Sequence, residues 1–165
     1  MTVACHVFPS LLWQLGAKAV SLTSDTLQVG LIASGTYSFT GGANGTKPFH
    51  VSDFLAGDGT NGALTEVSTS GTAYSRQTLT SVAVTPATDS FTNGTTYTLS
   101  CANPTWAAST ISAKYAFFYD NTFGSSTDST NLIMCYWDFG GTNSSSSGSF
   151  TLTISGSGLL QWTVS

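Results

Sequence analysis

The chain has 165 residues, enough for one domain with a core of its own, and we predict a single domain over residues 1–165. Only 7% of the residues are charged, whereas 27 threonines and 25 serines supply about a third of the chain, a composition that favours strands and turns over helices. The net charge is −4 and the four cations are scattered, which argues against nucleic acid as a partner.

The N-terminal segment, residues 1–22, is predicted to contain a short helix. Pro9 fits the first turn of a helix, and apolar residues recur at helical spacing around it. The apolar stripe contains Phe8, Leu11, Leu12, Leu15 and Ala19. Trp13 lies off the stripe, about 140° from Phe8 on a helical wheel, and is our candidate interface residue. Either it packs under a loop of its own chain, or it anchors a contact with another protein molecule.

The same segment has some features of a secretory signal, because an apolar run ends in Ala17-Lys18-Ala19. No basic region precedes the run, and Pro9 and Gln14 interrupt it, so we expect no cleavage. No stretch reaches the ~18 consecutive apolar residues of a transmembrane helix, so a membrane is not an expected partner.

The first predicted strand covers residues 26–32, in which Leu27, Val29 and Leu31 alternate with other residues. From Gly35 to Gly62 no period is visible, and we expect a long surface excursion held by its aromatic residues. Strands resume in ALTEVST and YSRQTLTSVAVT. Residues 89–102 then place Asn93-Gly94 between two β-rich arms, which predicts a hairpin with a type I′ turn.

The core signal is concentrated in the last third of the chain. Alternation from Ile111 to Tyr119 predicts one core-facing stripe, made of Ile111, Ala113, Tyr115, Phe117 and Tyr119. Residues 131–140, NLIMCYWDFG, are apolar on both faces, which predicts a central strand covered on two sides. SFTLTIS, GSG and LLQWTVS predict a C-terminal hairpin. The fold class is therefore all-β, an antiparallel sandwich or barrel of about eight strands with one short N-terminal helix.

Several motifs resemble catalytic signatures but lack their context. Asp138-Phe139-Gly140 matches the magnesium-binding triplet of protein kinases, yet the other kinase motifs are absent, so we expect Asp138 to cap the turn where a strand ends at Gly140-Gly141. Gly57–Gly62 matches GxGxxG without a strand before it and a helix after it. Asp120 and Asp138, at the ends of two neighbouring strands, are the closest candidate pair for a glycosidase.

The histidines and cysteines suggest no site either. His6 and His50 have no nucleophile or paired carboxylate motif beside them, and we expect structural roles. Cys5, Cys101 and Cys135 have no CxxC spacing, so we expect buried thiols, with a Cys101–Cys135 disulfide as the alternative. We therefore predict no enzyme, and no catalytic, cofactor-binding or metal-binding residue.

The order of these segments resembles a family of tailed-bacteriophage virion proteins, structural proteins of the head decoration and minor capsid type. The matching stretches are the N-terminal helix before DTLQVGLI, then FHVSDF, EVSTSGTAYSRQTLTSVAVT, WAASTISAKYAFFYD, LIMCYWDFGG and GSFTLTISGSGLLQWTVS. The resemblance covers most of residues 8–165. Its motifs are strand and turn patterns, and the family supplies no catalytic residue. This chain departs from the pattern in its apolar N-terminus, with Cys5, His6 and Trp13.

The resemblance implies a β-rich, cofactor-free virion component. We expect a capsid decoration (cement) protein that forms a homo-oligomer, binds the major capsid protein on the outer surface of the assembled head, and stabilises the lattice. The alternative is a tail- or fibre-associated protein with a carbohydrate- or receptor-binding face formed by Trp106, Trp137 or Tyr119. The composition also favours assembly, because three lysines leave strand edges with few of the charges that prevent edge pairing.

Overall fold

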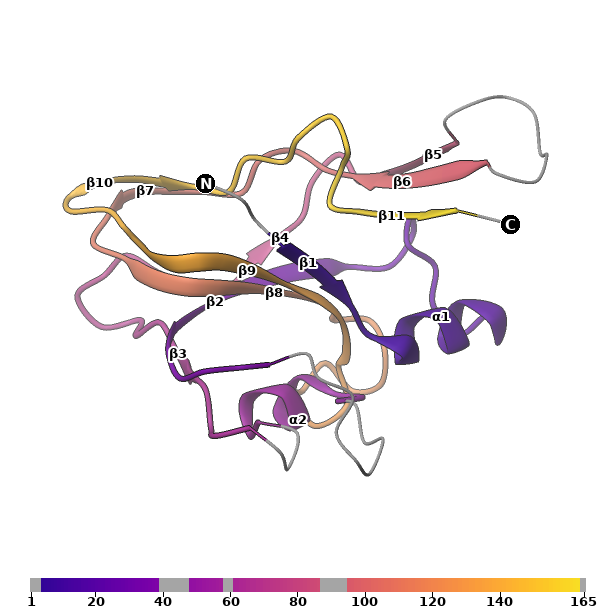
Figure 1. Ribbon diagram of the computed structural model, residues 1–165, viewed down its shortest axis with the longest axis horizontal. Coiled ribbons are helices and arrows are strands. Elements are labelled where there is room, and N and C mark those ends of the chain that lie inside the picture. The colour runs from indigo at the N-terminus through magenta and orange to yellow at the C-terminus, as the bar shows by residue number, and fades with distance from the viewer. Residues whose placement is uncertain (1–3, 39–47, 58–60, 87–94, 164–165) are drawn as a thin grey trace.

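The computed structural model describes residues 4–38, 48–57, 61–86 and 95–163 (Figure 1). The elements, in chain order, are β1 (Ala4–Val7), α1 (Pro9–Gly16), β2 (Leu27–Ser34), α2 (Val51–Leu55), β3 (Thr65–Glu66), β4 (Gln77–Thr78), β5 (Ala83–Pro86), β6 (Thr96–Ser100), β7 (Thr105–Ser109), β8 (Ser112–Asp120), β9 (Leu132–Ser144), β10 (Gly148–Thr151) and β11 (Leu160–Thr163). All the strand pairs described are antiparallel. The predicted class, a mainly β antiparallel sandwich with a short N-terminal helix, is confirmed.

A six-stranded sheet forms the centre of the fold. Its order is β1-β9-β8-β2-β3, and β4 also pairs with β2. β9 lies between β1 and β8 and is buried at every position from Leu132 to Trp137. The central strand predicted from its unbroken apolar run is confirmed, because a strand covered on both faces needs apolar side chains at consecutive positions. Two strands, β3 and β4, have two residues each, too short for a period to be recognised in the sequence.

Two hydrophobic cores lie on opposite faces of this sheet. Core A packs the sheet against two smaller sheets, β10-β7 and β11-β6-β5, with members such as Phe118, Leu99 and Leu160. Core B packs it against α2 through aromatic rings, among them Phe54 and Tyr136. In Figure 1 the two small sheets lie above the central sheet and α2 lies below it. The arrangement is sandwich-like, with the central sheet as the shared layer.

The stripe predicted from Ile111 to Tyr119 is divided between the two cores, so the single core-facing stripe is wrong. Ile111 and Ala113 belong to core A, whereas Tyr115, Phe117 and Tyr119 belong to core B. The register with β9 shifts between Ala113 and Tyr115. Irregularities of this kind increase the local twist and re-aim the side chains that follow. Alternation in one strand does not reveal where its partner will bulge.

The bulge lies at Gly140-Gly141, where the sequence predicted the end of a strand. β9 instead continues to Ser144. The pairs Tyr115–Asp138 and Ala113–Asn143 are two residues apart on β8 but five apart on β9, so the extra residues loop out of the ladder. Gly140 has φ 67°, a left-handed conformation that glycine adopts without steric cost, which lets the strand resume beyond it.

Within residues 4–22, the described part of the N-terminal segment, α1 is the helix, and a strand precedes it. β1 pairs with the outer edge of β9, with Cys5 opposite Trp137. The helix begins at Pro9 after the extended Phe8, as expected of proline in a first turn. Because Phe8 lies outside the helix, the predicted stripe is rotated: Leu11 and Gln14 are buried and Leu12 is exposed.

Two further expectations are corrected. The excursion from Gly35 to Gly62 contains the helix α2, which begins with a capping box between His50 and Asp53 and buries Val51 and Phe54. The C-terminal strands do not form a hairpin with each other: β10 pairs with β7, and β11 pairs with β6. The C-terminal segment therefore runs antiparallel to residues 96–109. The predicted Asn93-Gly94 turn lies outside the described residues. The strands on either side of it, β5 and β6, pair with each other.

Candidate functional site

Trp13, the predicted interface residue, lies on the outside of α1. Its exposed fraction is 68% and that of Leu12 is 55%, and these two are the exposed large hydrophobic residues of the described part of the chain. The Trp13 ring meets the ring of Phe49 edge-on, with centroids 6.3 Å apart. The structure thus brings Trp13 to a residue of its own chain and leaves most of its surface open.

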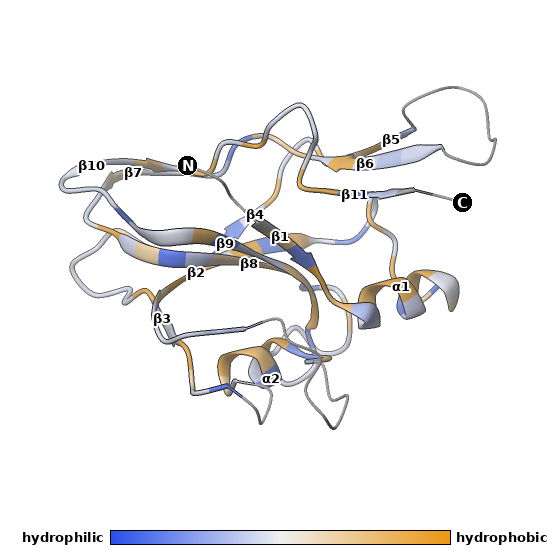
Figure 2. Cartoon of the chain, viewed as in Figure 1, coloured by the Kyte–Doolittle hydropathy of each residue, from blue (hydrophilic) through white to orange (hydrophobic). Residues whose placement is uncertain are grey.

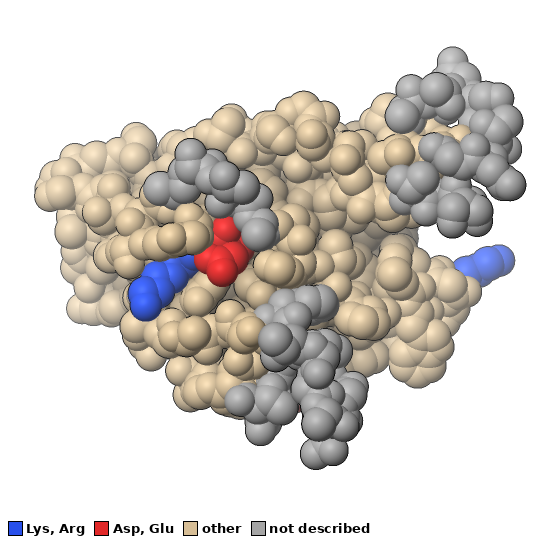
Figure 3. Space-filling model, in the orientation of Figure 1, with Lys and Arg blue, Asp and Glu red and all other residues tan. Residues whose placement is uncertain are grey.

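Leu12, Trp13, Phe49 and Phe123 form a surface that we call the α1 patch. The Phe49 and Phe123 rings are 6.0 Å apart, half-buried, and packed against core A. The residues of α1 carry no charge, and Figure 2 shows the helix at the periphery of the molecule, with hydrophobic stretches between more polar ones. Figure 3 shows few charged side chains on the face of the molecule that is in view. An exposed apolar surface on an uncharged element is typical of a protein-contact site.

The aromatic residues considered for a carbohydrate-binding face are buried. Trp106 is 2% exposed, Trp137 6% and Tyr119 2%. The indole of Trp106 donates a hydrogen bond to the Ser75 carbonyl at 2.7 Å, and the Tyr119 hydroxyl donates to the side chain of Gln28 at 2.5 Å. These three residues do not form the exposed aromatic face that such a function would require.

The candidate carboxylate pair is not brought together. Asp120 pairs with Leu132 at one end of the β8–β9 ladder, and Asp138 pairs with Tyr115. Five residues of β8 separate the two positions, about 17 Å along the strand, whereas the two carboxylates of glycosidases lie within ~10 Å. Asp138 Oδ1 accepts a hydrogen bond from the Gly140 amide at 2.8 Å, so it does cap a local turn, but inside a strand rather than at its end.

Both histidines take part in structural contacts. His6 stacks on the ring of Tyr136, with centroids 4.8 Å apart. The His50 amide donates to Asp53 Oδ2 at 2.9 Å at the start of α2. Of the GxGxxG match, residues 58–60 lie outside the described ranges, and Gly57 follows the end of α2 with φ 84°.

The cysteines differ from expectation in two ways. All three are free, so the possible Cys101–Cys135 disulfide is not formed. Cys135 is buried as predicted, but Cys101 is only half-buried and Cys5 is exposed. Burial raises the pKa of Cys101 to about 11.

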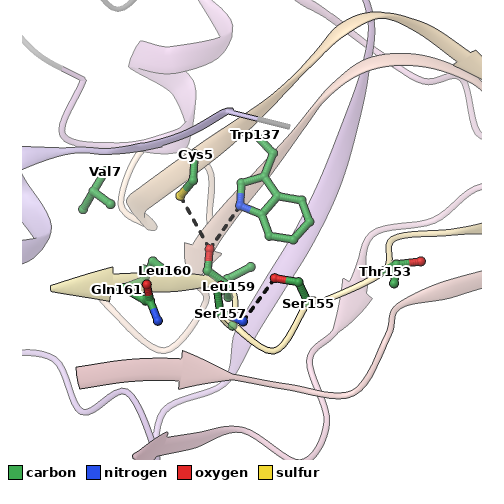
Figure 4. Close-up of a pocket in the computed structure, with 10 residues that line it drawn as sticks. Cys5, Val7, Trp137, Thr153, Ser155, Ser157, Leu159, Leu160 and Gln161 are labelled. Carbon is green, nitrogen blue, oxygen red and sulfur yellow. Dashed lines mark hydrogen bonds between the residues drawn. The ribbon is translucent and has the colours of Figure 1, made fainter. Parts of the chain in front are cut away.

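A pocket of about 530 Å³ opens where β1 and β9 meet the segment that leads into β11. Its lining combines apolar and hydroxyl-bearing residues: Cys5, Val7, Trp137, Thr153, Ser155, Ser157, Gly158, Leu159, Leu160 and Gln161. Figure 4 shows that Cys5 and Trp137 both point at the carbonyl oxygen of Leu159. The Cys5 thiol donates to that oxygen at 3.5 Å and the Trp137 indole donates at 3.1 Å.

Arg76 is the centre of an ion-pair network that sequence reasoning missed. Its guanidinium donates to both carboxylate oxygens of Glu66, at 2.8 and 2.7 Å, and to Asp128 Oδ2 at 2.8 Å. It also lies over the rings of Phe117 and Tyr119, at 5.2 and 5.3 Å. Burial by itself would lower the pKa of Arg76, but the hydrogen bonds to the two carboxylates raise it. These partners are far apart in the sequence, and no local pattern connects them.

Asp120 is a buried acid at the end of β8. Its exposed fraction is 0%; Oδ1 accepts hydrogen bonds from the amides of Thr122 and Phe123, and Oδ2 has no partner among the described residues. Burial raises the pKa of Asp120 to about 6, the two amides oppose this, and the neighbouring carboxyl of Asp25 raises it further. Asp120 therefore holds its proton to a higher pH than an ordinary aspartate does.

Within the described ranges no three His, Cys, Asp or Glu side chains lie together in a way that would hold a metal ion. None of the described helices has the length and apolar composition needed to cross a bilayer. Comparison of the chain with protein-family models, with curated proteins and with solved structures finds no match. Function is therefore inferred from the residues and their arrangement.

Proposed function

We propose that the protein is a non-enzymatic structural component of a tailed-bacteriophage particle, a decoration protein that binds the assembled head and stabilises it from outside. The observation that carries this proposal is the α1 patch, in which Trp13 and Leu12 are mostly exposed on an uncharged helix. Large aromatic residues that become desolvated supply much of the binding energy of protein interfaces.

The element next to the patch supports the same role. β1 is the end strand of the central sheet, and its residues, ACHV, include no lysine, arginine or carboxylate. End strands of sheets are normally protected from pairing by charges, prolines or bulges. Because β1 leads directly into α1, an uncharged edge and an exposed aromatic residue lie next to each other in the chain. One partner molecule covering this side would contact both.

A decoration protein acts through selective binding. If it binds the assembled lattice and not the free subunits, its binding free energy is added to the stability of the lattice. No catalytic residue is required for this function. The surface needs only complementary shape, apolar contacts and hydrogen-bonding groups, and this hydroxyl-rich chain supplies the last in large number.

The test is to measure the chain in purified particles of the phage that encodes it, and then to rebind isolated protein to particles depleted of it. We expect a fixed ratio to the major capsid protein, sedimentation with assembled heads, and no binding to unassembled capsid subunits. Absence of the chain from particles would overturn the proposal. A fixed ratio to a tail protein, with labelling of the tail in electron micrographs, would support the alternative of a tail or fibre position.

A further inference from the structure

β1 leaves a row of backbone hydrogen-bonding groups open along the edge of the central sheet. In an antiparallel pair, alternate residues exchange N–H···O bonds with the partner strand, and the residues between them direct both groups away from it. The Phe8 amide donates to the Met134 carbonyl at 2.9 Å, which fixes this alternation for the β1–β9 pair. The N–H and C=O groups of Cys5 and Val7 therefore point outward, and no hydrogen bond joins them to any part of the chain that the structure describes.

The two edges of the central sheet are protected differently. At the opposite edge, β3 and β4 have two residues each, and β3 carries the charged Glu66, which are two features that limit edge pairing. β1 has no charged residue, no proline and no register shift against β9. Cys5 is exposed, and Cys5 and Val7 both line the pocket of about 530 Å³, so solvent reaches this part of β1. The edge is therefore one that another strand can join.

We propose that β1 pairs antiparallel with β1 of a second copy of the chain, which joins the two central sheets across a two-fold axis. In a two-fold interface the same surface meets itself, so its hydrogen-bonding groups must be self-complementary. The outward groups of β1 meet this condition. With His6 opposite its counterpart, Cys5 of each copy faces Val7 of the other, and their N–H and C=O groups form four hydrogen bonds. This inference does not rest on the proposed virion function, because it concerns the isolated protein.

The length and charge of β1 favour a second copy over an unrelated strand. The next outward position after Val7 is Pro9, which has no N–H group and begins α1, so within the described chain Cys5 and Val7 alone can form the ladder. A longer partner strand would gain nothing beyond these two residues, whereas a second β1 has the same length. Two identical strands also bring like charges together, and β1 has none although the whole chain carries −4.

The first experiment measures the oligomeric state of the full chain by sedimentation velocity over a wide concentration range, with a reductant that prevents disulfides. We expect a reversible equilibrium between monomer and dimer. Amide hydrogen exchange then locates the interface: the Cys5 and Val7 amides should become protected as the concentration rises, whereas the Phe8 amide, bonded to Met134, should be protected at every concentration. A monomer at every concentration would overturn the proposal, and so would a dimer in which the Cys5 and Val7 amides still exchange freely.

Cys5→Pro and Cys5→Ala are a matched pair of variants, because both remove the thiol and proline alone removes the outward N–H group. Proline is tolerated in an edge strand where the N–H group faces solvent, so both monomers should fold, which circular dichroism verifies. Cys5→Pro deletes two of the four hydrogen bonds and should raise the dissociation constant of the dimer at least about tenfold. Cys5→Ala should dimerise as the wild type does. Equal dimerisation of the two variants would place the contact elsewhere and overturn the proposal.

A charge placed next to the two-fold axis gives an independent test. His6→Lys puts two ammonium groups opposite each other in the paired strands, where like charges are destabilising. His6→Gln is the uncharged control, since both substitutions remove the ring contact with Tyr136. Weaker dimerisation of the lysine variant, restored by high salt, would support the pairing, and equal dimerisation of the two would contradict it. If the isolated chain is monomeric and Cys5→Pro weakens only its incorporation into particles, β1 pairs with a different protein and the second copy is not its partner.

Discussion

The ring of Phe117 occupies the space that a side chain on Gly30 would need. The two residues pair directly between β2 and β8, and a Cβ atom on Gly30 would lie 2.3 Å from Cζ of Phe117. The same ring lies under the guanidinium of Arg76, at 5.2 Å. One aromatic side chain therefore determines three features: the close approach of β2 and β8, the packing of core B, and the position of the Arg76 network.

Gly30→Ala should destabilise the protein by roughly 1–3 kcal/mol, because the new methyl group must displace a ring in a packed core. Urea unfolding measures the change. Gly16→Ala is the matched control, since a Cβ at Gly16 would meet nothing within 4 Å. Equal stability of the two variants would mean that Phe117 moves aside without cost.

Phe117→Ala should cost about 3–5 kcal/mol of unfolding free energy, through lost burial and the cavity left behind. Phe117 is fully buried between Phe54 and Arg76, so the site has little room to collapse. Chemical denaturation with an unchanged m-value would verify a loss of this size. A loss below about 1 kcal/mol would contradict the assignment of Phe117 to core B.

Arg76→Met should lower the unfolding free energy by about 2 kcal/mol, because Glu66 and Asp128 lose their shared cation while remaining partly buried. Methionine retains most of the apolar stem of arginine, so the change in unfolding free energy measures the loss of the positive charge rather than the loss of packing. Lys18→Met is the control, since Lys18 takes part in none of the ion pairs that the structure describes. The Arg76→Met effect should shrink when Glu66→Gln and Asp128→Asn are added.

Asp120→Asn should remove a pH dependence that is the reverse of the usual carboxylate behaviour. The pKa of Asp120 is about 6 in the folded protein against 3.8 for an ordinary aspartate, so the folded state holds the proton more tightly. Stability from this proton is fully present below pH 3.8 and is lost as pH rises through about 6. Relative to the variant, the wild type should gain up to about 3 kcal/mol between pH 7 and pH 4.

The measurement is the difference in unfolding free energy between wild type and Asp120→Asn across that range, which cancels the titration of other acids. Asp25→Asn should give an intermediate result, because it removes the neighbouring charge that raises the Asp120 pKa and leaves burial in place. A difference that stays constant with pH would show that Asp120 titrates in the ordinary range.

Trp13→Ala should leave the melting temperature of the isolated protein almost unchanged and should weaken its incorporation into particles. The side chain is 68% exposed, so its removal takes little from the folded monomer. Leu11→Ala, on the buried face of the same helix, is the contrasting variant and should lower the melting temperature. If Trp13→Ala instead lowers the melting temperature by several degrees and incorporation is normal, Trp13 serves its own chain, and the attachment surface lies elsewhere.

Much of the secondary structure was predictable because its signals are local. Period-two alternation identified β2, the unbroken apolar run identified β9 as a central strand, and Pro9 marked the first turn of α1. The candidate site was predictable only in part: a tryptophan off the apolar stripe pointed to Trp13, whereas nothing in the sequence indicated the pocket that Cys5, Trp137 and Leu159 line. The same limit applies to Arg76, whose carboxylate partners are 10 and 52 residues away.

Strand alternation and composition in the sequence determined a β-rich fold with a charge-poor, hydroxyl-rich surface. The tertiary structure alone decided which strands pair. β10 and β11 have local patterns suited to a hairpin, yet each pairs with a strand between residues 96 and 109 instead. The bulge at Gly140 likewise divides one alternating stripe between two cores. The free energy of pairing two strands depends on whether the partner strand has a free edge, on the register between them, and on what packs against their faces. All three are set by segments that are distant in the chain.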